Sequence, residues 1–346
     1  MADHSSIEWT DATWNPVTGC SVVSPGCTNC YAMKLAGTRL KHHPSRAGLT
    51  RDTKAGPVWN GEVRLNSHWL DQPLRWKRPR RIFVCAHGDL FAENVPDEWI
   101  DQVFAIMALA GQHMFQVLTK RSARMRAYVS SLPARADAVA RAAACLWPGE
   151  DSDEAYYPVH EAIGEPLPNV WLGVSAEDQA RAVERVPDLL ETPAAIRFIS
   201  AEPLLGPIDL TKLDQPNHGG GPYWINSLAA TEMGWFSDEA ATIRTDADPL
   251  ADSGLPRLDW IIVGGESGKG ARPMHLDWAR SIRDQCAAAG VPFFFKQWGG
   301  LLPAGQRQAN GKLWAPQCGH SLSAAKSVAG RYLDGVEHNS MPGEGQ

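Results

Sequence analysis

Three cysteines near the amino terminus are the residues best suited to chemistry in this sequence. Cys20, Cys27 and Cys30 follow the spacing C-x6-C-x2-C within eleven residues. Glycine and proline around them favour a turn-rich backbone that can fold three sulfurs toward one point. Cysteine thiolates are ligands of zinc and of iron–sulfur clusters. The spacing therefore predicts a metal or cluster site in this loop.

The number of thiols distinguishes between the kinds of site. A structural zinc site takes four ligands, usually as two pairs, and only one C-x2-C pair is present here. His42 and His43 are a source for a fourth ligand, but they are adjacent and not spaced as a pair. An iron–sulfur cluster normally takes four thiolates, so three leave one iron open to bind another molecule. A zinc knuckle and a group of buried thiols are the alternatives that the spacing leaves open.

Short apolar segments alternate with helical stretches along the rest of the chain. Six such segments follow the cysteine loop, at residues 81–85, 114–118, 169–174, 195–199, 259–263 and 291–295. Continuous apolar strands between helices indicate a parallel sheet covered on both faces. A short strand before Cys20 brings the count to about seven. We therefore expect an α/β fold, a partial (β/α) barrel with six or seven parallel strands and its chemistry at their carboxyl ends.

Polar residues follow the end of each of these predicted strands. They are Asp89, Thr119, Lys120, Arg121, Ser175, Glu177, Glu202, Glu266, Arg272, Lys296 and Gln297. Each is also compatible with a helix cap or a solvated position, and Ser175 before Glu177 is an ordinary helix start. Their shared position favours one site. The glycine-rich residues 264–270 are not a Walker loop, because only three residues separate the first glycine from Gly268-Lys269.

The expected organisation is a single barrel-like domain over residues 1–300 with a carboxyl-terminal extension at 301–346. Two segments interrupt the alternation of strands and helices. Residues 131–166 are rich in alanine and arginine and then acidic, which predicts an inserted helix and loop. Residues 211–257 are rich in glycine, proline and aspartate, which predicts a long loop able to cover the strand ends.

The composition is that of a soluble globular protein. Of the 346 residues, 44% are hydrophobic and 21% charged, and no apolar run reaches the length of a membrane-spanning helix. The first residues lack the layout of a secretory signal. Seven cysteines, an odd number, do not suit a disulfide framework in a long chain. We expect a cytoplasmic protein with no membrane partner, in which Cys85 belongs to the core and Cys145, Cys286 and Cys318 have no chemical role.

One segment is strongly basic although the whole chain carries a net charge of −6. Residues 31–81 contain twelve Lys and Arg against three Asp and Glu, a net charge of +9. Trp59, Trp69 and Trp76 are interleaved with this charge. The combination is compatible with nucleic-acid binding through phosphates and base stacking. The alternative is a solvated basic surface with the tryptophans turned inward.

The cysteine loop, at the start of a (β/α) series, is similar to the cluster loop of radical S-adenosylmethionine enzymes. The whole chain resembles a phage- and bacterium-associated family with a three-cysteine motif, whose members are largely of unknown function. The matching segments are WTDATWNP (9–16), GDLF (88–91), LTKR (118–121), WLGVS (171–175), AEPLLG (201–206), GGESG (264–268) and FKQWG (295–299). Two features depart from the commonest pattern of radical enzymes: the first gap has six residues instead of three, and Asn29 replaces the usual aromatic.

The resemblance implies a [4Fe–4S] cluster on Cys20, Cys27 and Cys30, with S-adenosyl-L-methionine on the open iron. It implies an enzyme that generates a 5′-deoxyadenosyl radical to modify an unknown substrate. Combined with the basic segment, it is compatible with a nucleic acid or nucleotide as that substrate. An electron donor such as flavodoxin or ferredoxin would be its partner. In this resemblance Asp89 anchors the ammonium of the cofactor, and Lys120 or Arg121 its carboxylate. The other implied cofactor contacts are Thr119, Ser175, Glu177 and Glu202, and the substrate contacts are Glu266, Arg272, Lys296 and Gln297.

Two further functions are compatible with the sequence. One is a nucleic-acid-binding protein of a phage or mobile element, in which zinc or an iron–sulfur cluster is structural and no radical chemistry occurs. It depends on the basic segment 31–81 and its tryptophans. The other is a degenerate barrel that binds a nucleotide without turnover.

Overall fold

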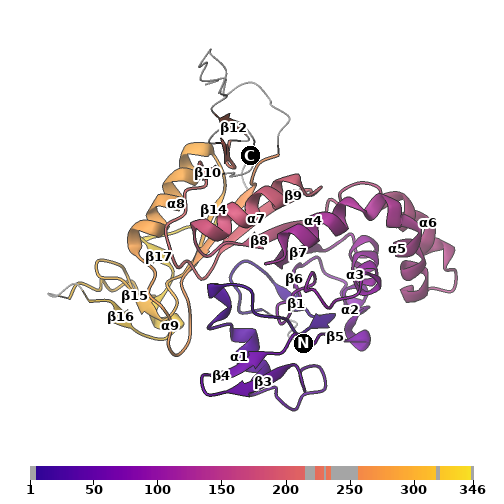
Figure 1. Cartoon of the computed structure of the whole chain (residues 1–346), viewed down its shortest axis with the longest axis horizontal. Helices are drawn as coiled ribbons and strands as arrows, with labels where there is room; N and C mark the ends of the chain where they lie inside the picture. The colour runs from indigo at the N-terminus through magenta and orange to yellow at the C-terminus, as the bar shows by residue number, and fades with distance from the viewer. Residues whose placement is uncertain (1–4, 215–222, 230, 235–255, 317–319, 344–346) are drawn as a thin grey trace. The chain divides into compact units, whose positions relative to one another are not determined.

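The computed structural model describes residues 5–214, 223–229, 231–234, 256–316 and 320–343. Most of the predicted insertion 211–257 and Cys318 lie outside these residues. Seven strands form one sheet in the order β1–β6–β7–β8–β9–β13–β14 (Figure 1). Their bounds are β1 (Ala12–Trp14), β6 (Arg81–Val84), β7 (Met114–Thr119), β8 (Val170–Ser175), β9 (Ile196–Ala201), β13 (Trp260–Gly264) and β14 (Phe293–Gln297). The predicted α/β fold with about seven parallel strands, as in a partial barrel, is confirmed.

The chain divides into two compact units. The first comprises residues 1–173 with 192–196, and the second comprises residues 174–191 with 197–346. The expectation of a single domain over residues 1–300 stays a prediction. Each unit is described by itself below.

The first unit is built on β1, β6 and β7, which pair in parallel. Large aromatic side chains fill its interior, because the strands are apolar on both faces. Trp14 packs on Phe115 with ring centroids 5.8 Å apart, and Trp9 packs on Phe83 at 4.8 Å. Helix α3 (Asp97–Leu109) comes after β6 in the chain, and helix α4 (Ser122–Ser130) comes after β7. Acidic side chains in the first turn of α3 complement the positive end of the helix dipole.

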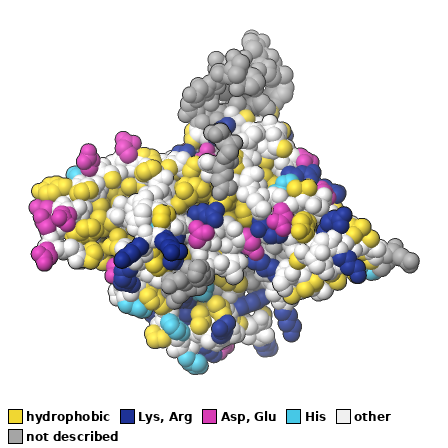
Figure 2. Space-filling view, turned by 180° about the vertical axis from the view of Figure 1, so that it is seen from behind, with side chains coloured by type: hydrophobic (Ala, Val, Ile, Leu, Met, Phe, Trp, Pro, Cys, Tyr) yellow, Lys and Arg dark blue, Asp and Glu magenta, His cyan; other side chains and the backbone are white. Residues whose placement is uncertain are grey.

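The predicted insertion 131–166 forms two helices that pack against each other. They are α5 (Leu132–Leu146) and α6 (Asp153–Ala162), and α5 also packs on α3. The acidic part of this segment is solvent-exposed, with Glu150, Asp151, Asp153, Glu154, Glu161 and Glu165 at the surface. Figure 2 shows acidic side chains gathered at the end of the first unit that these helices form.

The segment between β1 and β6 contains the cysteine loop and the basic residues. Its elements are β2 (Val17–Thr18), the 3-10 helix η1 (Pro25–Cys27), α1 (Tyr31–Gly37), β3 (Thr50–Thr53), β4 (Gly56–Trp59), β5 (Arg64–Leu65), the 3-10 helix η2 (Ser67–Trp69) and α2 (Gln72–Arg75). Helix α1 lies on the β3–β4 hairpin (Figure 1). A Cβ on Gly37 would come within 2.0 Å of Pro57, so this close contact requires glycine.

The second unit is built on β9, β13 and β14, which also pair in parallel. Helices α7 (Gln179–Glu191) and α8 (Leu276–Ala289) belong to this unit, and α8 packs beside β14. Trp260 and Trp298 are among its largest fully buried side chains. Its shorter elements are β10 (Leu213–Asp214), β11 (Tyr223–Asn226), β12 (Thr231–Gly234), β15 (Leu301–Leu302), β16 (Leu322–Ser323), α9 (Lys326–Ala329), β17 (Tyr332–Leu333) and β18 (Val336–Glu337). Within the described ranges, no helix has both the length and the apolar character needed to span a bilayer.

Candidate functional site

The three cysteines lie on one ordered loop of the first unit. Cys20 follows β2, Cys27 ends η1, and Cys30 immediately precedes α1. Backbone hydrogen bonds from Cys27 to Ser24 and from Cys30 to Cys27 hold the turns between them. Gly19 has a φ of 96°, and a Cβ there would lie 2.2 Å from the carbonyl oxygen of Glu62. Only glycine can therefore start this loop.

The pKa of the Cys20 thiol is set by burial and by its charged neighbours. Burial, followed by the Asp89 carboxylate, raises the pKa of Cys20 to about 12, and Cys30 and Cys27 act in the same direction. All three cysteines are free of disulfides. Cys20 and Cys30 pack against the apolar side chains that α1 buries. Cys27 and Cys30 thus lie within electrostatic range of the Cys20 thiol.

Three thiols on one loop are the ligand number expected of an iron–sulfur cluster with one open iron, and a cluster at this loop stays a prediction. Three thiols come from one loop, and a cluster distributes its thiolates over different irons. A single zinc ion instead brings every sulfur to about 2.3 Å from one point. Among the residues that the structure describes, no three His, Cys, Asp or Glu side chains are placed to hold one metal ion. His43, considered above as a fourth ligand, has its Nδ1 hydrogen-bonded to Ser45 and its ring stacked on Trp69.

Asp89, after the end of β6, is 5% exposed and uses both of its oxygens. Oδ1 accepts from the Phe91 amide at 3.0 Å and from the Thr119 hydroxyl at 2.7 Å. Oδ2 accepts from the Lys120 amide at 3.1 Å and from Arg121 Nη1 at 3.2 Å. A carboxylate offers about four lone-pair positions, and all are in use. The ammonium of a ligand would have to replace one of these donors.

Arg121, which lies between β7 and α4, connects Asp89 to the cysteine loop. Its Nη1 donates to Cys20 Sγ at 3.4 Å, and its Nη2 donates to the carbonyl oxygen of Ser21 at 3.0 Å. Its Nε and Nη2 donate to the two oxygens of Glu93 at 3.1 and 3.2 Å. Burial opposes its charge, but Asp89, Cys20 and Glu93 together hold the pKa of Arg121 above its ordinary value.

Lys120 differs from Arg121 in the partners of its side chain. Its amide is used by Asp89, whereas its half-buried ammonium has no acidic partner in the part of the chain that the structure describes. Of the two cations predicted to hold a carboxylate, Lys120 is therefore the one whose side chain is available.

In the second unit, Glu202, Lys296 and Gln297 form one group at the ends of β9 and β14. Lys296 Nζ donates to both Glu202 oxygens, at 2.8 and 2.7 Å, and Gln297 Nε2 donates to Oε1 at 3.2 Å. Gly264 makes room for this carboxylate, since a Cβ there would lie 3.2 Å from Glu202 Cδ. The sequence predicted these three residues as ligand contacts, and the structure brings them together.

Glu266 and Arg272 form a separate pair in the same unit. The amide and Nε of Arg272 donate to Glu266 Oε2, at 2.9 and 3.0 Å, and Nη2 binds Oε1. The backbone at the adjacent Gly265 lies close to the backbone at Trp298. A Cβ on Gly265 would lie 2.1 Å from the carbonyl oxygen of Trp298. The close approach that the glycine-rich segment allows is therefore between two backbone segments.

Ser175 and Glu177 are linked through a residue that the sequence did not single out. Arg185 Nη1 donates to the Ser175 carbonyl at 2.8 Å and to Glu177 at 3.1 Å. The side chains of Glu177 and Arg185 are 0% and 1% exposed. The Glu177 carboxylate thus has a buried protein partner and no exposed surface.

A family model described as a protein of unknown function, DUF5131, matches residues 4–342. The chain belongs to this family. Comparison with curated proteins and with solved structures gives no match. The family match spans the cysteine loop and the polar groups of both units, and its description states no activity.

Ser21 and Glu93 belong to this site, although the sequence did not predict them as site residues. Ser21 donates to Glu93 at 2.9 Å, and both bind Arg121, which lies 100 and 28 residues away along the chain. Neither residue follows an apolar strand directly, so periodicity gives no signal for them. Glu93 is four residues after Asp89, and this acidic spacing is the one local hint of a shared partner.

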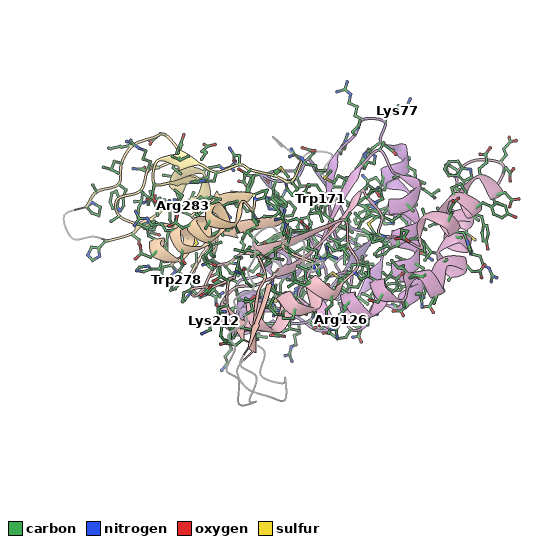
Figure 3. The ribbon with its side chains drawn as sticks, turned by 90° about the horizontal axis from the view of Figure 1, so that it is seen from above. Lys77, Arg126, Trp171, Lys212, Trp278 and Arg283 are labelled. Carbon is green, nitrogen blue, oxygen red and sulfur yellow. The ribbon has the colours of Figure 1, made fainter. Side chains whose placement is uncertain are left out.

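The basic segment 31–81 has much of its charge engaged within the protein. Lys41 pairs with Asp52 at 2.7 Å, and Arg81 pairs with Asp11 at 3.1 Å. Trp59 and Trp76 are buried, so their rings are turned inward. Figure 3 shows Lys77 pointing away from the ribbon. Nucleic-acid binding through this segment stays a prediction.

Proposed function

We propose that this protein binds a [4Fe–4S] cluster through Cys20, Cys27 and Cys30 and uses it with S-adenosyl-L-methionine. The observation that carries the proposal is the presence of three free cysteines on one loop, one of them hydrogen-bonded by a buried guanidinium. When bound, the cluster would supply an electron for reductive cleavage of the cofactor, which is the chemistry of radical enzymes. A nucleic acid or nucleotide is a candidate substrate.

The residues of this chain then divide the remaining tasks. The backbone turns at Gly19 and η1 shape the loop whose cysteines would hold the cluster. Lys120 supplies a cation for the carboxylate of the cofactor, because its ammonium forms no ion pair with an acidic side chain of the described residues. Asp89 accepts the cofactor's ammonium only if one of its present donors moves.

Anaerobic reconstitution with iron and sulfide tests this proposal. The wild-type protein should take up about four irons per chain and show the broad charge-transfer absorbance of a thiolate-bound cluster. A variant with Cys20, Cys27 and Cys30 all replaced by Ala should lose both signals. Cys145→Ala is the matched control, since Cys145 is an exposed free cysteine outside the loop. Stoichiometric zinc without iron after anaerobic purification, or full iron uptake by the triple variant, would contradict the proposal.

The role of the cofactor needs its own measurement. Addition of S-adenosyl-L-methionine to the reduced, reconstituted protein should change the electron paramagnetic resonance spectrum of the cluster. Incubation with reductant should then release 5′-deoxyadenosine. A cluster whose spectrum is indifferent to the cofactor would favour a structural site without radical chemistry.

A further inference from the structure

We infer that Arg121 is a positioning residue for the cluster: it holds the Cys20 end of the loop against the ends of β6 and β7 and donates a hydrogen bond to the ligand sulfur. The inference depends on the proposed function. It starts from a contact that joins residues 101 positions apart in the sequence.

The backbone of Arg121 is well fixed. Its amide donates to the hydroxyl of Thr119 at 2.9 Å, and its carbonyl oxygen accepts the first hydrogen bond of α4, from Met125, at 2.9 Å. The side chain therefore projects from a rigid junction between a strand and a helix. A loop anchored to such a junction has less freedom to move than a loop held by surface contacts alone.

The guanidinium of Arg121 has an acceptor for each of its N–H groups. Nη1 donates to Cys20 and Asp89, Nη2 donates to Ser21 and Glu93, and Nε donates to Glu93. Its side chain is 6% exposed. Because an arginine has five donors and all are used here, the group is saturated by the protein and has no donor left for a ligand.

The acceptors of Arg121 fall into two sets that belong to different parts of the first unit. Cys20 and Ser21 are in the cysteine loop, whereas Asp89 and Glu93 follow β6. Ser21 Oγ also donates directly to Glu93 at 2.9 Å. This hydrogen bond is a second link between the cysteine loop and the segment after β6. When the cluster is bound and Cys20 is a thiolate, removing the guanidinium would leave two carboxylates next to this sulfur, and the repulsion would push the loop away.

The hydrogen bond to Cys20 also has an electronic consequence. An N–H···S bond and a nearby positive charge withdraw electron density from a ligand sulfur, and this stabilises the reduced cluster. The reduction potential should therefore fall when Arg121 is lost. A purely structural ion pair would change the stability of the fold without selectively changing this potential.

The test compares Arg121→Gln with Arg124→Gln in the full-length protein after anaerobic reconstitution. Arg124 lies on α4 and also donates to the segment after β6, at the carbonyl oxygens of Ala92 and Val95. Among the described residues, its hydrogen bonds do not involve the cysteine loop. Arg121→Gln should lower the midpoint potential of the cluster and release iron to a chelator about tenfold faster than wild type. Arg124→Gln should match wild type in both measurements.

A second variant covers the case in which Arg121→Gln fails to fold. Glu93→Gln removes one carboxylate from the guanidinium and from Ser21 at a side chain that is 56% exposed, and it should accelerate iron release in the same direction with a smaller effect. Wild-type potential and iron retention in folded Arg121→Gln, or an unchanged release rate in Glu93→Gln, would overturn the inference. A wild-type protein that assembles no cluster would overturn the proposed function itself, so the two failures are distinguishable.

Discussion

The carboxylate of Glu177 and the guanidinium of Arg185 form an ion pair at 3.1 Å, and both side chains are withdrawn from solvent. The same guanidinium holds the carbonyl oxygen at the end of β8, so one side chain of α7 connects the strand end to the loop that follows it. Removing one partner of such a deeply buried pair lowers the stability of the fold, because the remaining charge has no water to solvate it. Glu177 therefore contributes to the stability of the second unit.

Replacing Glu177 by Ala should destabilise the protein strongly. The expected loss in the free energy of unfolding is about 3 kcal/mol, since Arg185 stays buried without its buried partner and keeps only the exposed Glu184, at 4.0 Å. Urea denaturation followed by circular dichroism measures it. The control is Asp284→Asn, which breaks an exposed pair with Arg283 in the same unit and should cost less than about 1 kcal/mol. Equal losses in the two variants would mean that burial does not decide the effect.

Gly265→Ala should also be destabilising, for a steric reason. The new methyl group would lie 2.1 Å from the carbonyl oxygen of Trp298, a distance that forces the two backbone segments apart. A loss of more than about 2 kcal/mol is expected. Gly111→Ala serves as the control, because a Cβ there meets nothing within 4 Å and its φ is not positive. A thermal melt of Gly265→Ala that coincides with wild type would show that this contact relaxes without cost.

His87 should make the protein less stable in mild acid. Burial and then the nearby Arg46 guanidinium lower the pKa of His87 to about 4, from an ordinary value of 6.5. The Nδ1 atom lies 2.8 Å from Arg46 Nη2, so in the neutral ring it accepts this hydrogen bond. Between pH 6.5 and 4 the unfolded chain binds a proton that the folded protein excludes, and the free energy of unfolding falls as the pH falls.

Comparing wild type with His87→Gln isolates this effect. Urea midpoints measured from pH 7 to pH 4 should decline more steeply in wild type than in the variant. His113 and His338, whose pKa values are also lowered by burial, are retained in both proteins and so do not contribute to the difference. Parallel curves for the two proteins would assign the acid sensitivity to other groups.

The thiol of Cys20 should respond to the charge of Asp89 in the cluster-free protein. The carboxylate adds to burial in raising the pKa of Cys20 to about 12, so Asp89→Asn should lower that pKa. Alkylation of Cys20, followed by mass spectrometry as a function of pH, should then reach its half-maximal rate at a lower pH. Cys145, exposed on α5, provides the internal reference and should react at the same rate in both proteins. An unchanged profile for Cys20 would show that Asp89 does not influence this thiol.

The strands could be predicted from sequence because their signal is local. Each is a short apolar run between polar segments, and the six predicted runs lie within two residues of the observed strands. The largest shift is at the last strand, predicted from Val291 and observed from Phe293. Pro292 has no N–H to donate, and only its carbonyl oxygen joins the ladder, by accepting from Ile261.

The sequence by itself determined the spacing of three thiols and the alternation of apolar strands with helices, because both depend on neighbours along the chain. Only the tertiary structure decided which polar residues are occupied by one another. Asp89 and Arg121 neutralise each other within one hydrogen-bond network, and Glu177 forms a buried ion pair with Arg185. Whether a charged side chain is available to a ligand depends on partners that lie close in space, and for Arg121 they come from up to 101 residues away in the chain.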